Sequence, residues 1–322
     1  MAVGRERARV VVLDDYQDVA RDAADWSCLD GRADVQMLHT HVPDEADLVA
    51  ALQDYDVVVC MRERTAFPKK VIDQLPRLRL LVTTGPSNAA IDVAAARANG
   101  VVVSGTGGLY HSPAELTWAL IHAVTRHIVV EDRALRQGSW QVSVGTELAG
   151  RTLGIVGLGR IGQRVARVAR AFDMQVLAWS ENLTSEIAEE HGATAVGKDE
   201  LFASSDVVSV HLQLSGRTAG VIGARELALM RPSAFIVNTS RGPIIDEPAL
   251  VEALRSGEIA GAGLDVFDVE PLPGDHPLRS LPSVVLTPHI GYVSKDVYAI
   301  FYADVVDDID KWLDGTPVRE LA

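Results

Sequence analysis

A glycine-rich turn between an apolar run and a helix-like segment constrains the fold of this chain most strongly. Gly157, Gly159 and Gly162 have the G-x-G-x-x-G spacing. The run 151–156 before them predicts a buried strand, and 163–172 carries apolar residues at helical spacing with arginines between them. In such a turn the glycines permit a tight bend, close approach of the backbone to a phosphate, and close helix–strand packing. The pattern predicts a dinucleotide-binding βαβ unit; a tight turn in some other α/β fold is the alternative.

Apolar runs typical of buried strands alternate with helix-like segments along the whole chain. The predicted strands before the turn are 10–13, 57–60, 78–82 and 101–103. From the turn onward they are 153–156, 175–179, 207–211, 234–237, 263–266 and 284–286. This alternation predicts an α/β fold with doubly wound parallel sheets and right-handed crossovers.

Two further segments read as helices, and the chain is long enough for two domains. Residues 109–127 predict one long buried helix with Pro113 in its first turn, and 294–312 alternate apolar and acidic residues at helical spacing. The 322 residues are too many for one typical domain. We place the boundary between the two domains after residue 103.

The composition narrows the possible partners and the compartment. A net charge of −14 argues against nucleic acid or an anionic membrane surface as the main partner. No window approaches 18 consecutive apolar residues, and residues 1–9 lack the apolar core of a signal peptide. Cys28 and Cys60 form no C-x-x-C motif, as expected of thiols in a reducing compartment. We therefore expect a cytoplasmic protein.

Three segments after the glycine turn resemble a known family. Their sequences are Asn-Thr-Ser-Arg-Gly-Pro-Ile-Ile-Asp at 238–246, Gly-Leu-Asp-Val-Phe-Asp-Val-Glu-Pro-Leu at 263–272, and Thr-Pro-His-Ile-Gly-Tyr at 287–292. Their order and spacing resemble the Arg, Asp/Glu and His segments of the D-isomer-specific 2-hydroxyacid dehydrogenases, which include glyoxylate and hydroxypyruvate reductases and phosphoglycerate dehydrogenases. The resemblance covers nearly the whole chain.

The resemblance implies a domain organisation and an assembly. Residues 1–103 with 293–322 would form a flavodoxin-like, substrate-binding domain, and 104–292 a Rossmann-like, NAD-binding domain. The active site would lie in the cleft between them. The protein would be a homodimer, with 109–127 and the following arm near the interface.

Reducing a 2-oxo acid requires a hydride donor, a cation that holds the carboxylate and polarises the carbonyl, and an acid that protonates the developing alkoxide. The resemblance assigns the cation to Arg241, whose planar fork suits a carboxylate. It assigns the acid to His289, because histidine titrates near neutral pH. Glu270 would orient His289 and stabilise its charged form. Taken singly, Arg241 could be a surface ion pair, Glu270 a loop residue, and His289 a strand-end hydrogen-bonding group.

The cofactor contacts follow from the turn and from the resemblance. Glu181 lies near the position where an acidic residue binds the adenosine ribose, although the usual Asp of the family aligns with Ser180. A carboxylate at 181 would repel a 2′-phosphate, which favours NAD over NADP; the alternative is that Glu181 faces solvent. The full set of predicted cofactor contacts is Gly157, Gly159, Arg160, Ile161, Gly162, Ser180, Glu181, Leu212, Thr239, Arg241, Asp265 and His289. Asp265 would bind the nicotinamide carboxamide, or only cap a strand.

The substrate, a small 2-oxo or 2-hydroxy acid, would be held by residues from both parts of the chain. Gly85 and Ser87 resemble the family's carboxylate-binding loop, in which backbone N–H groups hold the anion, whereas Pro86 has no N–H to offer. Arg62 or Arg64 could reach a second anionic group or could form a solvated edge with Glu63. The predicted substrate contacts are Arg62, Arg64, Gly85, Ser87, Arg241 and Tyr292, of which Tyr292 could instead pack the hinge.

Two other interpretations complete the sequence analysis. His39 and His41 are too few for a metal site and predict a surface loop, and the mechanism needs no metal. The corepressors called C-terminal-binding proteins use the same fold as a cofactor-sensing interaction module. That function remains the alternative to an enzyme.

Overall fold

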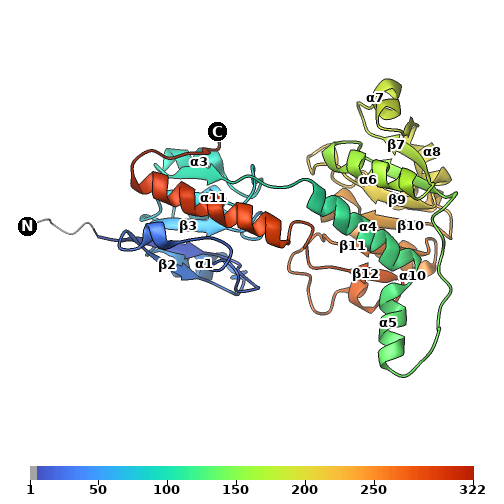
Figure 1. Ribbon diagram of the computed structural model, residues 1–322, viewed down its shortest axis with the longest axis horizontal. Coiled ribbons are helices and arrows are strands. Elements are labelled where there is room, and N and C mark those ends of the chain that lie inside the picture. The colour runs from blue at the N-terminus through green and yellow to red at the C-terminus, as the bar shows by residue number, and fades with distance from the viewer. Residues whose placement is uncertain (1–5) are drawn as a thin grey trace, which may run out of the picture. The chain divides into compact units, whose positions relative to one another are not determined.

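The structure is a computed structural model that describes residues 6–322, and the chain divides into two compact units. Unit 1 comprises the described residues up to Leu109 together with Val293–Ala322, and unit 2 comprises Tyr110–Tyr292. Residues 1–5, which make up most of the segment 1–9 considered for a signal peptide, lie outside the described residues. Each unit is an α/β domain built on its own parallel sheet (Figure 1). The predicted α/β fold with two parallel-sheet domains is confirmed.

The sheet of unit 1 has five parallel strands in the order β2-β1-β3-β4-β5. They are β1 (Ala8–Val12), β2 (Ala33–Met37), β3 (Val57–Cys60), β4 (Leu80–Thr83) and β5 (Val102–Gly105). The largely apolar β3 and β4 are buried along their whole length. Edge strand β2 alternates half-buried and exposed residues. It was not predicted, because its sequence contains no apolar run.

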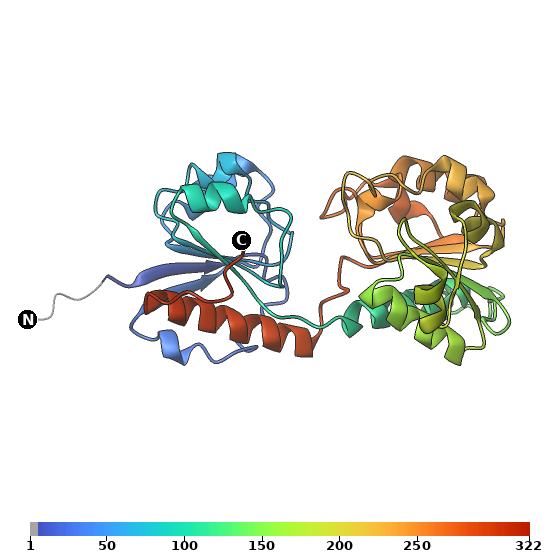
Figure 2. The same ribbon diagram turned by 90° about the horizontal axis from the view of Figure 1, so that it is seen from above.

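Helices cover both faces of this sheet. On one face, α1 (Glu45–Leu52), α2 (Lys69–Ile72) and α3 (Val93–Ala98) contribute apolar residues to a core that includes Val58 and Leu81. On the other face lies the long C-terminal helix α11 (Lys295–Leu313), which contacts β4 and the short 3-10 helix η1 (Ser27–Leu29). Figure 2 shows α11 and α3 on opposite sides of the sheet.

The sheet of unit 2 has seven parallel strands in the order β12-β11-β10-β9-β6-β7-β8. They are β6 (Thr152–Val156), β7 (Gln175–Trp179), β8 (Thr194–Ala195), β9 (Val207–Val210), β10 (Phe235–Asn238), β11 (Gly261–Leu264) and β12 (Val284–Leu286). The direction of winding reverses between β6 and β9, where a doubly wound sheet binds its ligand. Six strands were predicted; β8 was missed because it is only two residues long.

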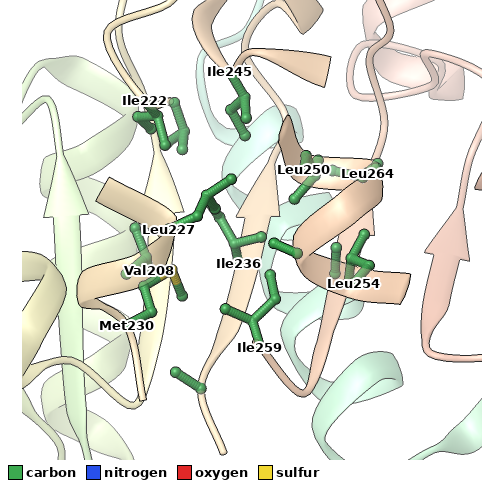
Figure 3. Close-up of a cluster of buried hydrophobic side chains, with 14 of the residues drawn as sticks. Val208, Ile222, Leu227, Met230, Ile236, Ile245, Leu250, Leu254, Ile259 and Leu264 are labelled. Carbon is green, nitrogen blue, oxygen red and sulfur yellow. The ribbon is translucent and has the colours of Figure 1, made fainter. Parts of the chain in front are cut away.

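Two helical layers cover the faces of this sheet. On one face, α4 (His111–Thr125) packs against α6 (Arg160–Ala171). On the other, α8 (Lys198–Ser204), α9 (Ala224–Leu229) and α10 (Glu247–Ser256) cover a core drawn in Figure 3. In that core, side chains of α9 and α10 contact the strands through residues such as Leu227, Leu254 and Ile236. The short helix α7 (Ser185–Glu190) lies beside β8.

The predicted long helix over 109–127 corresponds to α4, and the helix that follows it was not predicted. Helix α4 ends at Thr125, and a second helix, α5 (Ile128–Arg136), begins after His127. His127 has φ 52°, a left-handed conformation that breaks the helical hydrogen-bond ladder. Helix α4 buries Leu120, Ile121 and Val124, whereas α5 buries no residue within the chain. Among the described residues, no helix has the length and apolar character needed to cross a membrane.

Candidate active site

The predicted site residues of unit 2 follow the carboxyl ends of its strands. Gly157 follows β6, Ser180 follows β7 and Asp265 follows β11. Arg241 and His289 come shortly after β10 and β12. Because every strand pair in this sheet is parallel, these residues lie along one edge, the edge at which doubly wound sheets bind ligands.

The glycine turn has the geometry that a pyrophosphate requires. Gly157 has φ +100° and donates its N–H to Trp179 O at 2.8 Å, and a Cβ there would lie 2.7 Å from the His211 carbonyl oxygen. A Cβ at Gly162 would collide with the carbonyl of Gly157, whereas Gly159 faces open space within 4 Å. Gly159 is the N-cap of α6, so the first N–H groups of that helix have no partner within it. These features fit a dinucleotide at the start of α6.

His289 and Glu270 form a hydrogen-bonded pair. Nδ1 of His289 lies 2.6 Å from Oε2 of Glu270. The other carboxylate oxygen, Oε1, accepts the backbone N–H of Phe267 at 2.9 Å. Both side chains remain partly accessible, at 18% for His289 and 30% for Glu270. A carboxylate fixed in this way holds the imidazole ring and leaves its Nε2 atom for a substrate.

Asp265 holds the His segment in place. Its Oδ1 accepts the hydroxyl of Thr287 at 2.6 Å and the N–H of Ile290 at 2.8 Å, and its Oδ2 accepts the N–H of Gly291 at 2.8 Å. Asp265 is fully buried. Burial raises its pKa, and the hydrogen bonds from Thr287 and Ile290 act in the opposite direction. Between these anchors His289 has φ 52°, a strained conformation of the kind found at functional sites.

The Arg segment packs directly against the segment that carries Glu270. A Cβ at Gly242 would overlap the backbone of Phe267 and lie 2.6 Å from Asp268 N. Asn238 fixes the turn before it, because its Nδ2 donates to Arg241 O at 2.9 Å and its Oδ1 accepts Ser240 N–H at 3.0 Å. The guanidinium of Arg241 donates to Ser240 O at 2.7 Å. Arg241 and Glu270 are therefore held by neighbouring backbone segments.

The remaining cofactor candidates belong to unit 2 as well. Ser180 and Glu181 follow β7; Ser180 is half-buried and Glu181 is exposed. Leu212 comes shortly after β9. The hydroxyl of Thr239 lies 2.8 Å from that of Thr117 on α4, which ties the end of β10 to this helix. Arg160 and Ile161 form the first turn of α6.

The substrate candidates of unit 1 cluster at the ends of β3 and β4. Arg62 has φ 52° and donates from Nη1 to Thr84 O at 3.2 Å, and its side chain covers Gly85 so closely that a Cβ there would collide with it. Arg64 donates to Asp14 O at 2.7 Å, with its guanidinium 4.5 Å from the centre of the Tyr16 ring. These contacts order both arginines, and Nε of Arg62 also lies 3.5 Å from Oε2 of Glu63, the pairing of the alternative interpretation.

The N–H of Gly85 donates to Thr106 Oγ1 at 2.6 Å. This hydrogen bond occupies the N–H that was predicted to bind the substrate carboxylate, and residues 84–87 carry no signal that Thr106 reaches it. Ser87 is exposed and keeps its predicted role open. Tyr292 contacts His289 in unit 2, with ring centroids 5.6 Å apart and an interplanar angle of 74°.

His39 is exposed in the loop after β2, as predicted, and it lies beside carboxylates. Possible ligand atoms of Asp15, Asp18 and His39 lie within 4.8 Å of one another. Asp15, however, uses its carboxylate to accept the N–H groups of Val19 and Ala20 at 3.0 and 3.2 Å.

Cys28 and Cys60 are both free, and burial raises the pKa of Cys60 to about 12.

Sequence reasoning missed the residues that support the catalytic side chains. The hydroxyl of Thr287 donates to Asp265, and the backbone N–H of Phe267 donates to Glu270. Gly242 lets the segment that carries Arg241 approach the backbone of Phe267. Thr287 could have been found from its place in the Thr-Pro-His segment. The close approach at Gly242 depends on two distant segments and has no local signal.

Comparisons with known proteins agree with this geometry. Residues 118–291 match the family profile described as D-isomer specific 2-hydroxyacid dehydrogenase, NAD binding domain. The chain belongs to this family. Unit 2 contains its NAD-binding domain, so the predicted NAD cofactor is confirmed.

Two curated relatives differ in name and in length. A D-3-phosphoglycerate dehydrogenase of Synechocystis is 38% identical over 278 residues, which are 85% of this chain and 50% of that protein. A glyoxylate reductase of Aeropyrum pernix is 42% identical over 236 residues, 70% of each chain. A phosphoglycerate oxidoreductase structure from Vibrio cholerae has a TM-score of 0.91 and 37% identity, covering 96% of this chain and 99% of that one. The chain spans about half the length of the Synechocystis relative.

Proposed function

We propose that this protein is an NAD-dependent D-2-hydroxyacid dehydrogenase that interconverts a small 2-oxo acid and the matching D-2-hydroxy acid. The observation that carries the proposal is the 2.6 Å contact between His289 and Glu270 at the cofactor-binding edge of the sheet. A histidine fixed through Nδ1 by a carboxylate is suited to moving a proton at Nε2.

His289 acts as the acid in reduction and as the base in oxidation. The nicotinamide, when bound, supplies or accepts the hydride. His289 Nε2 gives a proton to the oxygen that was the carbonyl, and the Glu270 carboxylate stabilises the charged imidazole during this exchange. The left-handed backbone of His289, fixed by the Asp265 anchors, keeps the ring from turning away.

Arg241 binds the substrate carboxylate and polarises the carbonyl through its guanidinium. Two guanidinium groups of unit 1, Arg62 and Arg64, are ordered by backbone carbonyls and suit a second anionic group on the substrate. Ser87 would add a donor, and Tyr292 would shape the wall of the pocket next to His289.

The cofactor is held by the residues along the same edge. Backbone N–H groups of Arg160 and Ile161 face the pyrophosphate, and Glu181 accepts a hydrogen bond from the ribose and disfavours a 2′-phosphate. Asp265 has lone pairs beyond those that anchor the His segment, and we assign the nicotinamide carboxamide to it.

We further propose that the protein is a homodimer. The support is a set of exposed apolar side chains on α5 and the arm after it, which are Ile128, Val129, Leu135, Trp140, Val142 and Val144. Trp140 is 76% and Val144 is 91% exposed, and monomeric proteins rarely expose a cluster of large apolar side chains in this way. Light scattering after gel filtration tests this: Trp140→Asp combined with Val144→Asp should give monomers.

The experiment that tests the proposed activity measures NADH and NADPH oxidation with glyoxylate, hydroxypyruvate and phosphohydroxypyruvate. We expect turnover with NADH for at least one acid, and loss of turnover with retention of NADH binding in His289→Gln. Tight NADH binding without turnover on any acid would favour the cofactor-sensing alternative.

A further inference from the structure

The solvent-facing side of α6 carries a row of arginines. Arg160, Arg164, Arg167 and Arg170 recur every three or four residues, which places them on one side of the helix. Over these positions the helix rises by about 15 Å. The opposite side of α6 is buried against α4 and the sheet through Val165 and Ala169. The arginine row is thus separate from the packing of the domain.

The arginine row lines a cavity of about 400 Å³. The other lining residues are Tyr110, Gln163, Glu190 and His191. Arg160 is ordered by Tyr110, with its guanidinium 4.8 Å from the centre of the ring. Arg170 lies against Gly192, where a Cβ would meet its side chain. The cavity therefore has walls from α6, from the end of α7 and from Tyr110.

The charge in this cavity is not neutralised by the protein itself. Across residues 6–322, no ion pair joins Arg164, Arg167 or Arg170 to a carboxylate, and Glu190 is the only acidic residue among those that line the cavity. Arg225 elsewhere in unit 2 contacts both Asp199 and Glu226. In a chain of net charge −14, four uncompensated arginines in one hollow create a local positive field.

We propose that this cavity binds a small oligophosphate, an anion with two or more linked phosphate groups. Guanidinium groups bind phosphate oxygens through paired N–H donors. A row of them along about 15 Å of helix suits successive phosphates better than one isolated anion. The net negative charge of the chain opposes an extended nucleic acid, which would have to pass beyond this limited basic area.

The proposed site differs from the cofactor site. The pyrophosphate of NAD is expected at the N–H groups of the first turn of α6, whereas Arg164, Arg167 and Arg170 project from later turns. The inference does not depend on the proposed dehydrogenase activity. Saturation with NAD⁺ separates the two sites in an experiment, because it fills the cofactor site at the first turn of α6 and leaves Arg164, Arg167 and Arg170 open.

The test is calorimetric titration of the full chain, saturated with NAD⁺, with inorganic tripolyphosphate. We expect one equivalent to bind, with an affinity that falls as ionic strength rises. Arg164→Gln combined with Arg167→Gln should weaken binding at least about tenfold. Arg217→Gln, which removes an exposed arginine outside the cavity, should leave binding unchanged. The unfolding temperatures of both variants show that the fold is kept.

Three results would overturn the proposal. One is absence of tripolyphosphate binding to the wild-type protein at low ionic strength. Another is equal binding by the wild-type protein and the Arg164/Arg167 variant. Displacement of tripolyphosphate by single-stranded RNA at lower concentrations than by unlabelled tripolyphosphate would also reject a small-anion site. Turnover of 2-oxo acids should be the same in the wild-type protein, the Arg164/Arg167 variant and the Arg217 variant. A failure of the oligophosphate proposal would therefore not contradict the proposed dehydrogenase activity.

Discussion

Nδ1 of His289 contacts one carboxylate oxygen of Glu270 at 2.6 Å, while the other carboxylate oxygen accepts the N–H of Phe267 at 2.9 Å. The carboxylate thus connects the His segment to the segment that precedes it. Both contacts use the carboxylate as acceptor only, which requires His289 to donate from Nδ1. In the proposed mechanism, the proton that His289 transfers is then the one at Nε2.

Glu270→Gln should lower kcat for reduction by about 10- to 100-fold, with a smaller change in the KM for NADH. The amide keeps the size of the side chain but removes the charge that stabilises protonated His289. Reduction should therefore decline at a lower pH than in the wild-type protein. The pH profile of kcat from 5 to 9 checks this, and an unchanged profile would show that the carboxylate serves only to hold the loop.

Asp265→Asn should disorder the His segment. The buried carboxylate accepts three hydrogen bonds, from Thr287 and Ile290 at Oδ1 and from Gly291 at Oδ2. The amide oxygen of asparagine can still accept the first two, but the NH₂ group in place of Oδ2 would face the donor N–H of Gly291. We expect a loss of about 1–3 kcal/mol in the free energy of unfolding, together with reduced turnover. Urea denaturation gives the first quantity. Thr287→Val, which removes one of the three donors, should have a smaller effect of the same kind.

The strands that were predicted well are those with an apolar run between turn residues. β3, β7 and β12 have the predicted bounds, although β3 is buried along its length and β12 is only half-buried. β2 is half-exposed at a sheet edge and β8 has two residues, so neither has an apolar run to detect. Helix α5, which begins just after the end of the predicted helix 109–127, was not predicted; it buries no residue within the chain.

The sequence could predict the chemical types of the site residues and the strands that they follow, but not the tertiary contacts that hold them. The carboxyl-end positions of Arg241, Asp265 and His289 follow from strand prediction, since parallel strands bring these ends together. The hydrogen bond from Gly85 N–H to Thr106 and the close approach of Gly242 to the backbone of Phe267 depend on tertiary packing. Such contacts between distant segments leave no periodic pattern in the sequence.

Gly242→Ala should reduce turnover more than it reduces NADH binding. The added methyl group would overlap the backbone of Phe267, so the segment that carries Glu270 must move. A displacement of about 1 Å at reacting groups can cost about 100-fold in rate. Gly216→Ala is the matched control, because a Cβ there meets nothing within 4 Å. Equal rates for the two variants would mean that the contact at Gly242 does not position Glu270.

Glu181→Arg should shift the cofactor preference toward NADPH. In the proposed site Glu181 disfavours the 2′-phosphate, and an arginine would bind it. We expect kcat/KM for NADPH relative to NADH to rise by about tenfold or more. Steady-state kinetics with both cofactors measure the ratio, and Glu186→Arg on α7 controls for the change in net charge. A ratio that moves equally in both variants would place Glu181 outside the ribose site.

The stability of unit 1 should depend on pH through Asp308. This side chain on α11 is buried and contacts Arg319 Nε at 3.0 Å. Burial raises its pKa to about 7, with nearby Asp304 and Asp307 adding to the rise. In unfolded chains an aspartate titrates near pH 3.9. Between about pH 4 and 7 the folded state therefore binds more protons than the unfolded state, and this group lowers the stability as the pH rises.

Asp308→Asn removes this titration, so the free energy of unfolding should fall less between pH 5 and 8 than in the wild-type protein. The amide oxygen can still accept the hydrogen bond from Arg319, so the contact itself is preserved. Urea denaturation at the two pH values measures the difference. Asp307→Asn is the control, because Asp307 contacts the same arginine at 2.7 Å but is 45% exposed. A wild-type pH dependence in Asp308→Asn would mean that the buried carboxylate is ionised throughout this range.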